Sequence, residues 1–524
     1  MAFSVGDING DGIDDLALGA PYGGSRLTSY GYEYSRGEGR AYIIFGKRDG
    51  FSADVDVSSL DGNNGFALGG IDAQDNLGTA ITSAGDINGD GIDDLAVSAA
   101  GAGQTITNNN GYSYSDRSGE TFIVFGNNNF NSSINLALLD GNNGFKIRGK
   151  DSGDLLGEHL SNAGDINGDG IDDLILGTPA AGEALISPFD RGDSDHRGET
   201  YVVFGKNNGF NSIFDLNSLN GNNGYTVAGI GIEDSLGSAV GIGDINGDGI
   251  DDLILGARNA SQTGEYTFEG GAYVIFGQNT GFDAQFDLTT LDGSNGFSIP
   301  GLDLDDNLGN AVGVGDINGD GIDDLIVGAN TAGQTLMGAD GAEYSDRRGA
   351  AYIIYGKNSD FSAEIDLNTL NFLEGAKITG INQDNIFGSA ISSGGDVNHD
   401  GIDDLIISAP DVDLTGEYSR EGESYLVFVS EVNNSNLIVG TPQNDTLNGT
   451  PGNDEIIGLQ GADTIDGAEG NDILRGGKDE DLLIGSEGDD FIEGNEHRDI
   501  LEGRQDNDTL NGNGSNDILK GNSG

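Results

Sequence analysis

Short runs of apolar and β-branched residues, separated by glycine-rich polar stretches, recur along most of the chain. In one unit these runs cover residues 77–81, 94–98, 121–126 and 145–149. The last run alternates apolar and polar side chains, which is typical of a half-exposed outer strand. No stretch of useful length has the spacing of an amphipathic helix. The pattern therefore predicts repeated units of four short antiparallel strands.

An acidic string, GDINGDGIDDL, lies between the first and second strand of each unit. It occurs in six copies at nearly even intervals, and the last copy is written GDVNHDGIDDL. Four strands in a unit of this length suit the blade of a β-propeller. The sequence therefore predicts an all-β fold, with a propeller of six visible blades over residues 1–430.

Strand direction determines where the loops lie. Neighbouring strands of a meander alternate in direction, so loops joining the first to the second strand and the third to the fourth share one face. Loops joining the second to the third strand, and links between units, share the opposite face. All six acidic strings are therefore expected on one face of the propeller.

The acidic string has the chemistry of a cation-binding loop. Oxygen-bearing side chains stand at positions one, three, five and nine, glycine at position six, and position seven offers its carbonyl. This resembles the start of an EF-hand loop, although the position of its final glutamate is Leu18. Two carboxylates about 5 Å apart repel by about 3 kcal/mol at an effective dielectric near 20. Oxygen donors without Cys or His predict Ca²⁺.

The predicted ligands follow the same positions in every copy. Asp14 and its counterparts at position eight are expected to point to solvent, and His399, at position four of the last loop, is not expected to bind the ion. The predicted ligands are, at position one, Asp7, Asp86, Asp165, Asp244, Asp316 and Asp396; at position three, Asn9, Asn88, Asn167, Asn246, Asn318 and Asn398; at position five, Asp11, Asp90, Asp169, Asp248, Asp320 and Asp400; at position seven, Ile13, Ile92, Ile171, Ile250, Ile322 and Ile402; and at position nine, Asp15, Asp94, Asp173, Asp252, Asp324 and Asp404.

The acidic string and the LGxA[IV] run before it resemble the FG-GAP repeat of the integrin α-subunit N-terminal β-propeller. The resemblance covers residues 1 to about 430. It implies calcium at the positions given above and a role in extracellular adhesion. Integrin propellers have seven blades, so the six copies visible here either form a six-bladed propeller or are part of a seven-bladed one. The last copy, which ends at Phe428, has no clear fourth strand.

The repeat changes near residue 437, after a polar stretch at 431–436 that is predicted to be a linker. Nine aspartates then follow one another at every ninth position, from Asp445 to Asp517. Units such as GAEGNDIL are similar to the RTX, or haemolysin-type, repeat. The resemblance implies a parallel β-roll over residues 437–524, with the apolar residue two after each aspartate pointing inward. It also implies calcium between turns, at Asp454, Asp463, Asp472, Asp481 and Asp490.

The turns from Asp499 to Asp517 are expected to bind more weakly, because the glycine two residues before the aspartate is lost at His497, Asp506 and Ser515. The RTX resemblance further implies export that needs no N-terminal leader. At low cytosolic calcium the chain would stay unfolded and competent for export, and extracellular calcium would then fold it.

Composition supports this interpretation. The net charge of −65, from 88 acidic and 23 basic residues, disfavours nucleic acid and anionic membranes and favours divalent cations. The absence of cysteine excludes disulfides and thiolate metal sites. No apolar stretch approaches the length of a membrane span, and the N-terminus lacks the pattern of a signal peptide. We expect a secreted or cell-surface monomer.

Tyrosine and arginine recur in the loops between the second and third strands, opposite the acidic strings. Residues of these types favour binding hot spots, but they could equally pair within their own loops. Examples are Tyr34, Tyr114, Tyr344 and Tyr418. Arg191-Gly192-Asp193, in the third of these loops, spells the tripeptide that animal integrins recognise, and chance can account for it in this composition.

No motif of a metalloprotease, a serine hydrolase or a P-loop enzyme occurs in the sequence, so we expect no catalysis. The leading hypothesis is a secreted calcium-binding protein that attaches to an extracellular protein or carbohydrate. The alternatives are a structural surface or matrix scaffold, and the non-catalytic part of a larger exported enzyme.

Overall fold

The computed structural model describes residues 2–521 apart from 24–26, 29–30, 33–36, 73, 108–112, 183–194, 262–266, 334, 338–342, 372–373, 413–419, 430–436 and 515. The chain divides into two compact units, Met1–Phe428 and Val429–Gly524. No helix in the described residues has the length and hydropathy of a membrane-spanning segment.

Six antiparallel sheets form the N-terminal unit, which confirms the predicted blades. In the second sheet the strand order is β7 (Ile81–Gly85), β8 (Asp94–Ala99), β11 (Glu120–Val124) and β13 (Gly144–Arg148). The first strand begins at Ile81 rather than at Leu77 as predicted, and Leu77 forms an isolated bridge with Gly39 of the preceding blade.

The other sheets repeat this order. The last has three strands among the described residues. The sheets are β1 (Ala2–Ser4), β2 (Leu16–Ala20), β5 (Arg40–Ile44), β6 (Gly65–Gly69); β14 (His159–Gly164), β15 (Asp173–Thr178), β16 (Glu199–Val203), β18 (Gly224–Ala228); β19 (Leu236–Gly243), β20 (Asp252–Ala257), β21 (Gly271–Ile275), β23 (Gly296–Pro300); β24 (Leu308–Gly315), β25 (Asp324–Ala329), β28 (Ala350–Ile354), β29 (Gly375–Thr379); and β30 (Ile391–Ser393), β31 (Leu405–Ala409), β32 (Glu423–Val427).

Short elements in the loops were not predicted. Strands of two residues, each from the blade that follows, pair in parallel with the fourth strands of the first three sheets. They are too short to show a period in the sequence. These strands are β12 (Ser133–Ile134), β17 (Ile213–Phe214) and β22 (Gln285–Phe286), and the 3₁₀ helices that follow the third strands are η1 (Val57–Ser59), η2 (Leu136–Leu138), η3 (Leu216–Ser218) and η4 (Leu288–Thr290).

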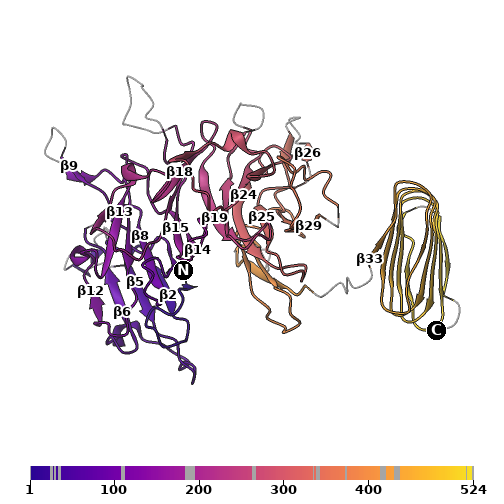
Figure 1. Cartoon of the computed structure of the whole chain (residues 1–524), viewed down its shortest axis with the longest axis horizontal. Helices are drawn as coiled ribbons and strands as arrows, with labels where there is room; N and C mark the ends of the chain where they lie inside the picture. The colour runs from indigo at the N-terminus through magenta and orange to yellow at the C-terminus, as the bar shows by residue number, and fades with distance from the viewer. Residues whose placement is uncertain are drawn as a thin grey trace. The chain divides into compact units, whose positions relative to one another are not determined.

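Hairpins extend three of the loops between the second and third strands. They are β3 (Leu27–Thr28) with β4 (Gly31–Tyr32), β9 (Thr105–Thr107) with β10 (Ser113–Ser115), and β26 (Thr335–Met337) with β27 (Glu343–Ser345). Figure 1 shows β9 and β26 on the same, upper side of the unit, as strand direction predicts.

Aromatic side chains join consecutive blades. Phe145 stacks on Phe210 of the next blade with ring centroids 4.2 Å apart, and Phe297 stacks on Phe361 at 4.6 Å. Each hydrophobic cluster is built from the strands of two neighbouring sheets. Figure 1 shows the sheets following one another in chain order. Each of the first four blades is therefore stabilised by the blade after it.

The C-terminal unit is built from two parallel sheets, and each strand pairs with the strand two nonapeptides later in the chain. The apolar residues two after the aspartates fill its core as predicted, namely Ile456, Ile465, Leu474, Leu483, Ile492 and Leu501, all fully buried. The sheets are β33 (Leu437–Val439), β35 (Glu455–Leu459), β37 (Ile473–Gly477), β39 (Phe491–Asn495), β41 (Thr509–Asn511); and β34 (Thr446–Asn448), β36 (Thr464–Glu469), β38 (Leu482–Glu487), β40 (Ile500–Arg504), β42 (Ile518–Lys520).

Candidate calcium sites

The acidic string forms the same tight loop in each of the six blades. The position-one carboxylate accepts hydrogen bonds from the backbone N–H groups of positions five and six, which closes the loop. In the second blade Asp86 accepts from Asp90 at 2.8 Å and from Gly91 at 2.7 Å. The position-five carboxylate of Asp90 accepts in turn from the N–H of Ile92 at 3.1 Å. The loop is thus folded by its own aspartates.

The position-nine aspartates are buried where the second strand begins. The Oδ1 atom of Asp94 accepts from the N–H of Gly126, which follows the third strand, at 2.8 Å. Burial raises the pKa of Asp94 to about 8, of Asp252 to about 8, and of Asp15 to about 7, and repulsion by acids earlier in each loop adds to the effect. A buried carboxylate among other acids requires a proton or a cation.

The position-three asparagines turn their amides toward the position-nine carboxylates. In the second blade Nδ2 of Asn88 lies 2.9 Å from Oδ2 of Asp94. Among the described residues, no group of three or more His, Cys, Asp or Glu side chains is arranged to hold a metal ion, because the acids point to backbone N–H groups. The oxygen donors nonetheless have the chemistry that calcium takes. The ligand assignment in these loops stays a prediction.

Position eight departs from the expectation that its side chains point to solvent. Asp14 is exposed as expected. Asp93, in contrast, accepts a hydrogen bond from the backbone N–H of Asp7, in the loop of the preceding blade, at 2.7 Å. The sequence could not show this contact, because the two residues are 86 positions apart.

His399 occupies position four of the last loop, where the other loops have glycine. It is exposed and adopts a φ of 65°, close to the 73° of Gly89 at the same position in the second blade. The substitution therefore leaves the backbone of the loop unchanged.

The aspartates of the C-terminal unit form a ladder with a period of two nonapeptides. From Asp463 to Asp517, the Oδ1 atom of each accepts from the backbone N–H of the aspartate two nonapeptides earlier, at 2.8 to 3.2 Å. The Oδ2 atom is buried and has no hydrogen-bond partner in Asp463, Asp472, Asp481, Asp490, Asp499 and Asp508. A Cβ added at Gly467 would lie 2.2 Å from Oδ2 of Asp472. Glycine thus leaves open the space before the orphaned oxygen, which fits calcium.

This ladder refines the predicted set. Asp454 differs from the others, because its Oδ2 accepts from the N–H of Thr450 at 2.6 Å. Asp499 and Asp508 have the same orphaned oxygen as the central turns, and their weaker binding stays a prediction. His497 and Asp506 adopt φ values of 73° and 69°, against 104° to 128° at Gly461, Gly470 and Gly488.

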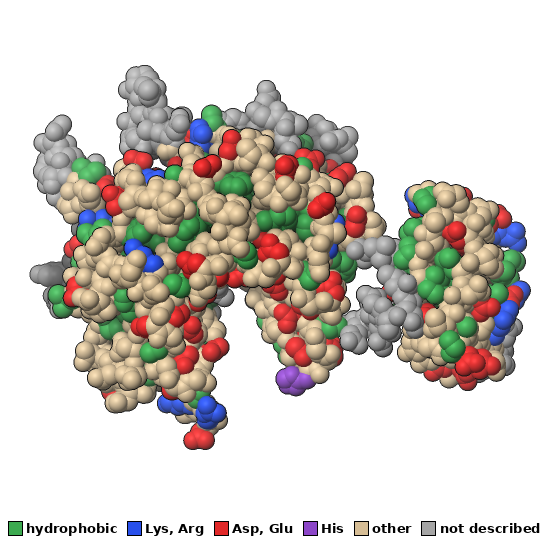
Figure 2. Space-filling view, in the orientation of Figure 1, with side chains coloured by type: hydrophobic (Ala, Val, Ile, Leu, Met, Phe, Trp, Pro, Cys, Tyr) green, Lys and Arg blue, Asp and Glu red, His purple; other side chains and the backbone are tan. Residues whose placement is uncertain are grey.

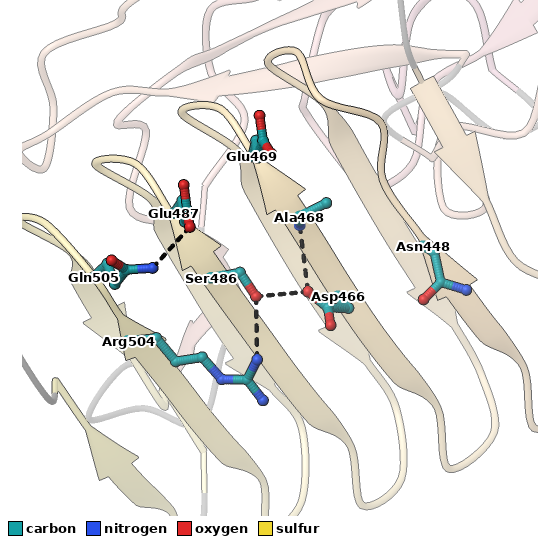
Figure 3. Close-up of a pocket in the computed structure, with 8 residues that line it drawn as sticks. All are labelled: Asn448, Asp466, Ala468, Glu469, Ser486, Glu487, Arg504 and Gln505. Atoms are coloured by element: carbon teal, nitrogen blue, oxygen red, sulfur yellow. Dashed lines mark hydrogen bonds between the residues drawn. The ribbon is translucent and has the colours of Figure 1, made fainter.

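The outer face of the C-terminal unit carries a second ladder, which lines a shallow groove (Figure 3). The Ser486 hydroxyl donates to Oδ1 of Asp466 at 2.7 Å, and Arg504 donates to Ser486 at 3.3 Å. Gln505 donates to Glu487 at 3.0 Å. These contacts link successive turns outside the core.

The loops opposite the acidic strings are described only in part. Arg191-Gly192-Asp193, Tyr34 and Tyr418 lie outside the described residues. Arg197 donates from Nε to Asp195 at 2.9 Å, and Arg420 lies 3.6 Å from Asp411. These two arginines pair with local acids, the alternative that the sequence left open.

Family comparisons agree with both units. The FG-GAP repeat model matches residues 1–44, 78–115, 157–203, 236–275, 308–354 and 387–427. The model of the RTX calcium-binding nonapeptide repeat matches four overlapping segments between residues 439 and 524. The chain is an FG-GAP repeat protein with C-terminal RTX calcium-binding repeats. We call residues 2–428 the FG-GAP unit and residues 437–521 the RTX unit.

Relatives of two kinds carry similar segments. The chain is 24% identical over 370 residues to a phosphatidylinositol-glycan-specific phospholipase D of Dictyostelium discoideum, covering 68% of this chain and 35% of that protein. It is 30% identical over 165 residues to the human phospholipase, covering 32% and 17%. It is 26% identical over 305 residues to integrin alpha pat-2 of Caenorhabditis briggsae, covering 53% and 21%. The chain thus spans about a third or less of these relatives.

Calcium affinity of the FG-GAP unit is expected to fall as pH falls. The metal-free pKa values of Asp94 and Asp252 are about 8, so below this pH calcium must displace a proton from each. The affinity should fall by up to about tenfold per pH unit between pH 8 and pH 6. Calorimetry in buffers of different ionisation enthalpy would measure the affinity and the protons released. A calcium affinity that does not change between pH 8 and pH 6 would contradict the prediction.

Proposed function

We propose that this chain is an extracellular calcium-binding protein that attaches to a protein or carbohydrate ligand through its FG-GAP unit. In this proposal calcium fills the loops of one face, and the ligand binds the opposite face. The RTX unit folds around its own calcium ions once the chain meets extracellular calcium. The chain acts by binding rather than by catalysis, and as a monomer.

Exposed aliphatic side chains on the face opposite the calcium loops carry the proposal. They lie on the links between blades, close in sequence to the fourth strands. Ile232, Leu304 and Ile381 are 55%, 57% and 73% exposed, and Ile71 and Ile230 are also exposed. Figure 2 shows hydrophobic side chains among acidic ones on the surface of the FG-GAP unit. In a chain of net charge −65, exposed apolar groups that recur in these links on one face favour contact with a partner.

Serine substitution of Ile232, Leu304 and Ile381 together tests the proposal. A glycan array and a panel of immobilised matrix proteins would be probed with the full chain, in millimolar calcium and in chelator. Leu138 is the matched control, because it is 68% exposed and lies between a third and a fourth strand, which strand direction places on the face of the calcium loops. We expect calcium-dependent binding that the triple variant loses and Leu138→Ser retains. Equal binding by both variants would contradict the proposed face.

The phospholipase relatives favour a second candidate function. They indicate that this kind of segment can occur in a longer enzyme, in which case this chain would be a calcium-dependent attachment module. The activity in their name belongs to those proteins. An assay of the full chain with a glycosylphosphatidylinositol-anchored substrate separates the candidates, because turnover would contradict a role in binding alone.

A further inference from the structure

Each calcium loop of the first four blades is attached to the following blade by an aspartate. Oδ2 of Asp172 accepts from the N–H of Asp86 at 2.8 Å. Oδ2 of Asp251 accepts from the N–H of Asp165 at 2.9 Å, and Oδ2 of Asp93 accepts in the same way from the N–H of Asp7. Oδ2 of Asp323 accepts from Asp244 at 3.0 Å. The same bond thus occurs between four consecutive pairs of blades, always from position eight to position one of the blade before.

A second contact runs parallel to the first. The N–H of Lys206, which follows the third strand of the third blade, donates to the carbonyl of Ile87, at position two of the second loop, at 2.9 Å. The residue before it, Gly205, donates to the position-nine carboxylate of Asp173 at 2.9 Å. The second loop is therefore contacted by Asp172, the chain neighbour of Asp173, and by Lys206, the chain neighbour of Gly205.

Close packing makes the first contact specific. A Cβ on Gly6 would lie 2.2 Å from Oδ2 of Asp93, and one on Gly164 would lie 2.5 Å from Oδ2 of Asp251. The glycine that opens the acidic string thus leaves room for the carboxylate of the next blade. Side-chain and backbone positions in two blades are fixed together.

We infer that the position-eight aspartates Asp93, Asp172, Asp251 and Asp323 are positioning residues for the calcium loop of the preceding blade. The inference rests on the proposed binding of calcium by these loops. When calcium orders the loop from Asp165 to Asp173, it also fixes Asp172 and Gly205. The loop from Asp86 to Asp94 then loses less conformational entropy when it binds its own ion. Calcium binding in neighbouring blades is therefore coupled, and the coupling acts equally on both loops of a pair.

The two end blades supply internal comparisons. Asp14 has the same position in the first blade but is exposed. Asp403, in the sixth blade, accepts from the hydroxyl of Ser393 in its own sheet at 2.9 Å. Asp14 therefore provides a control of the same residue type at the same position.

Hydrogen exchange of the full chain during a calcium titration tests the inference, because it reports each loop separately. In Asp172→Ala, we expect the calcium midpoint of residues 86–94 to rise about tenfold, since a charge-assisted hydrogen bond is lost. The midpoint of residues 165–173 should also rise, because the coupling is reciprocal, whereas that of residues 316–324 should change less than twofold. Asp172→Asn should keep the midpoint of residues 86–94 close to that of the unchanged chain, because its side-chain carbonyl can accept the same hydrogen bond. Asp14→Ala should leave every midpoint unchanged.

Equal shifts in all six loops, or no shift in 86–94, would overturn the inference while leaving calcium binding intact. Absence of calcium-dependent protection in all six loops of the unchanged chain would overturn the proposed calcium function, and the inference with it. If Asp172→Ala does not fold, Asp323→Ala makes the same test on residues 244–252.

Discussion

Excess chelator is expected to speed the amide exchange of residues 455–504 in the RTX unit about a hundredfold or more. A ligand at 100 times its Kd stabilises a fold by about 2.7 kcal/mol per site, and a change of this size in one site already changes exchange about a hundredfold. The physical reason is the row of buried Oδ2 atoms without partners, from Asp463 to Asp508. Leaving such oxygens buried without a cation is costly.

Hydrogen exchange of the full chain in millimolar calcium and in chelator measures this effect. The expected exchange at pH 7.5 is fast in chelator and slow in calcium. Magnesium at the same concentration is the control, because its octahedral preference suits these sites less well. Equal protection in calcium and in chelator would refute the prediction.

Acid should restore part of the metal-free RTX fold. Burial raises the pKa of Asp472 and Asp481 to about 7 and of Asp490 to about 6, and neighbouring carboxylates add to it. Because these folded-state pKa values exceed the unfolded value near 3.8, the stability that the protonated groups contribute is fully present below pH 3.8 and is lost as the pH rises through 6 to 7. In chelator, the RTX unit should exchange more slowly at pH 4.5 than at pH 7.5, after correction for intrinsic rates.

Asp252→Ala is expected to lower the unfolding free energy of the FG-GAP unit by about 3–6 kcal/mol, because it leaves buried N–H groups unpaired at about 1–3 kcal/mol each. The Asp252 carboxylate accepts from Gly277 at 2.9 Å, from Ile245 at 3.0 Å and from Asn246 at 3.2 Å. It therefore joins three segments of one blade. The substitution also removes a predicted calcium ligand.

Denaturant unfolding and calcium calorimetry separate the two effects. The unfolding midpoint in chelator reports the lost hydrogen bonds, and the stoichiometry in calcium should fall by one ion. Asp49→Ala, in an exposed turn, is the control and should change neither value. A loss below about 1 kcal/mol would contradict the structural role of Asp252, and an unchanged stoichiometry would contradict its role as a ligand.

The sequence predicted features that depend on local order. The acidic string marked the turn between the first two strands, and the residue two after each RTX aspartate was correctly placed in the core at Leu474 and its counterparts. Both depend on neighbours within a few residues. The fold class followed from these patterns and their periods.

Contacts between distant residues were beyond the sequence. Asp93 was expected in solvent because nothing near it in the chain indicates that Asp7 lies beside it. The isolated bridge between Leu77 and Gly39 of the preceding blade was equally hidden in the sequence. The orphaned oxygens of Asp499 and Asp508 were also beyond the sequence, because they depend on contacts between turns.

The pairing of RTX strands that lie two nonapeptides apart has a consequence for changes in chain length. Removal of two consecutive nonapeptides would delete one complete coil and leave every remaining partner in place. Removal of a single nonapeptide would move each following strand to the other sheet and bring unlike outer side chains, such as Arg475 and Asp466, into one row. Shortening or lengthening by pairs of nonapeptides therefore preserves the architecture, whereas single nonapeptides exchange its two sides.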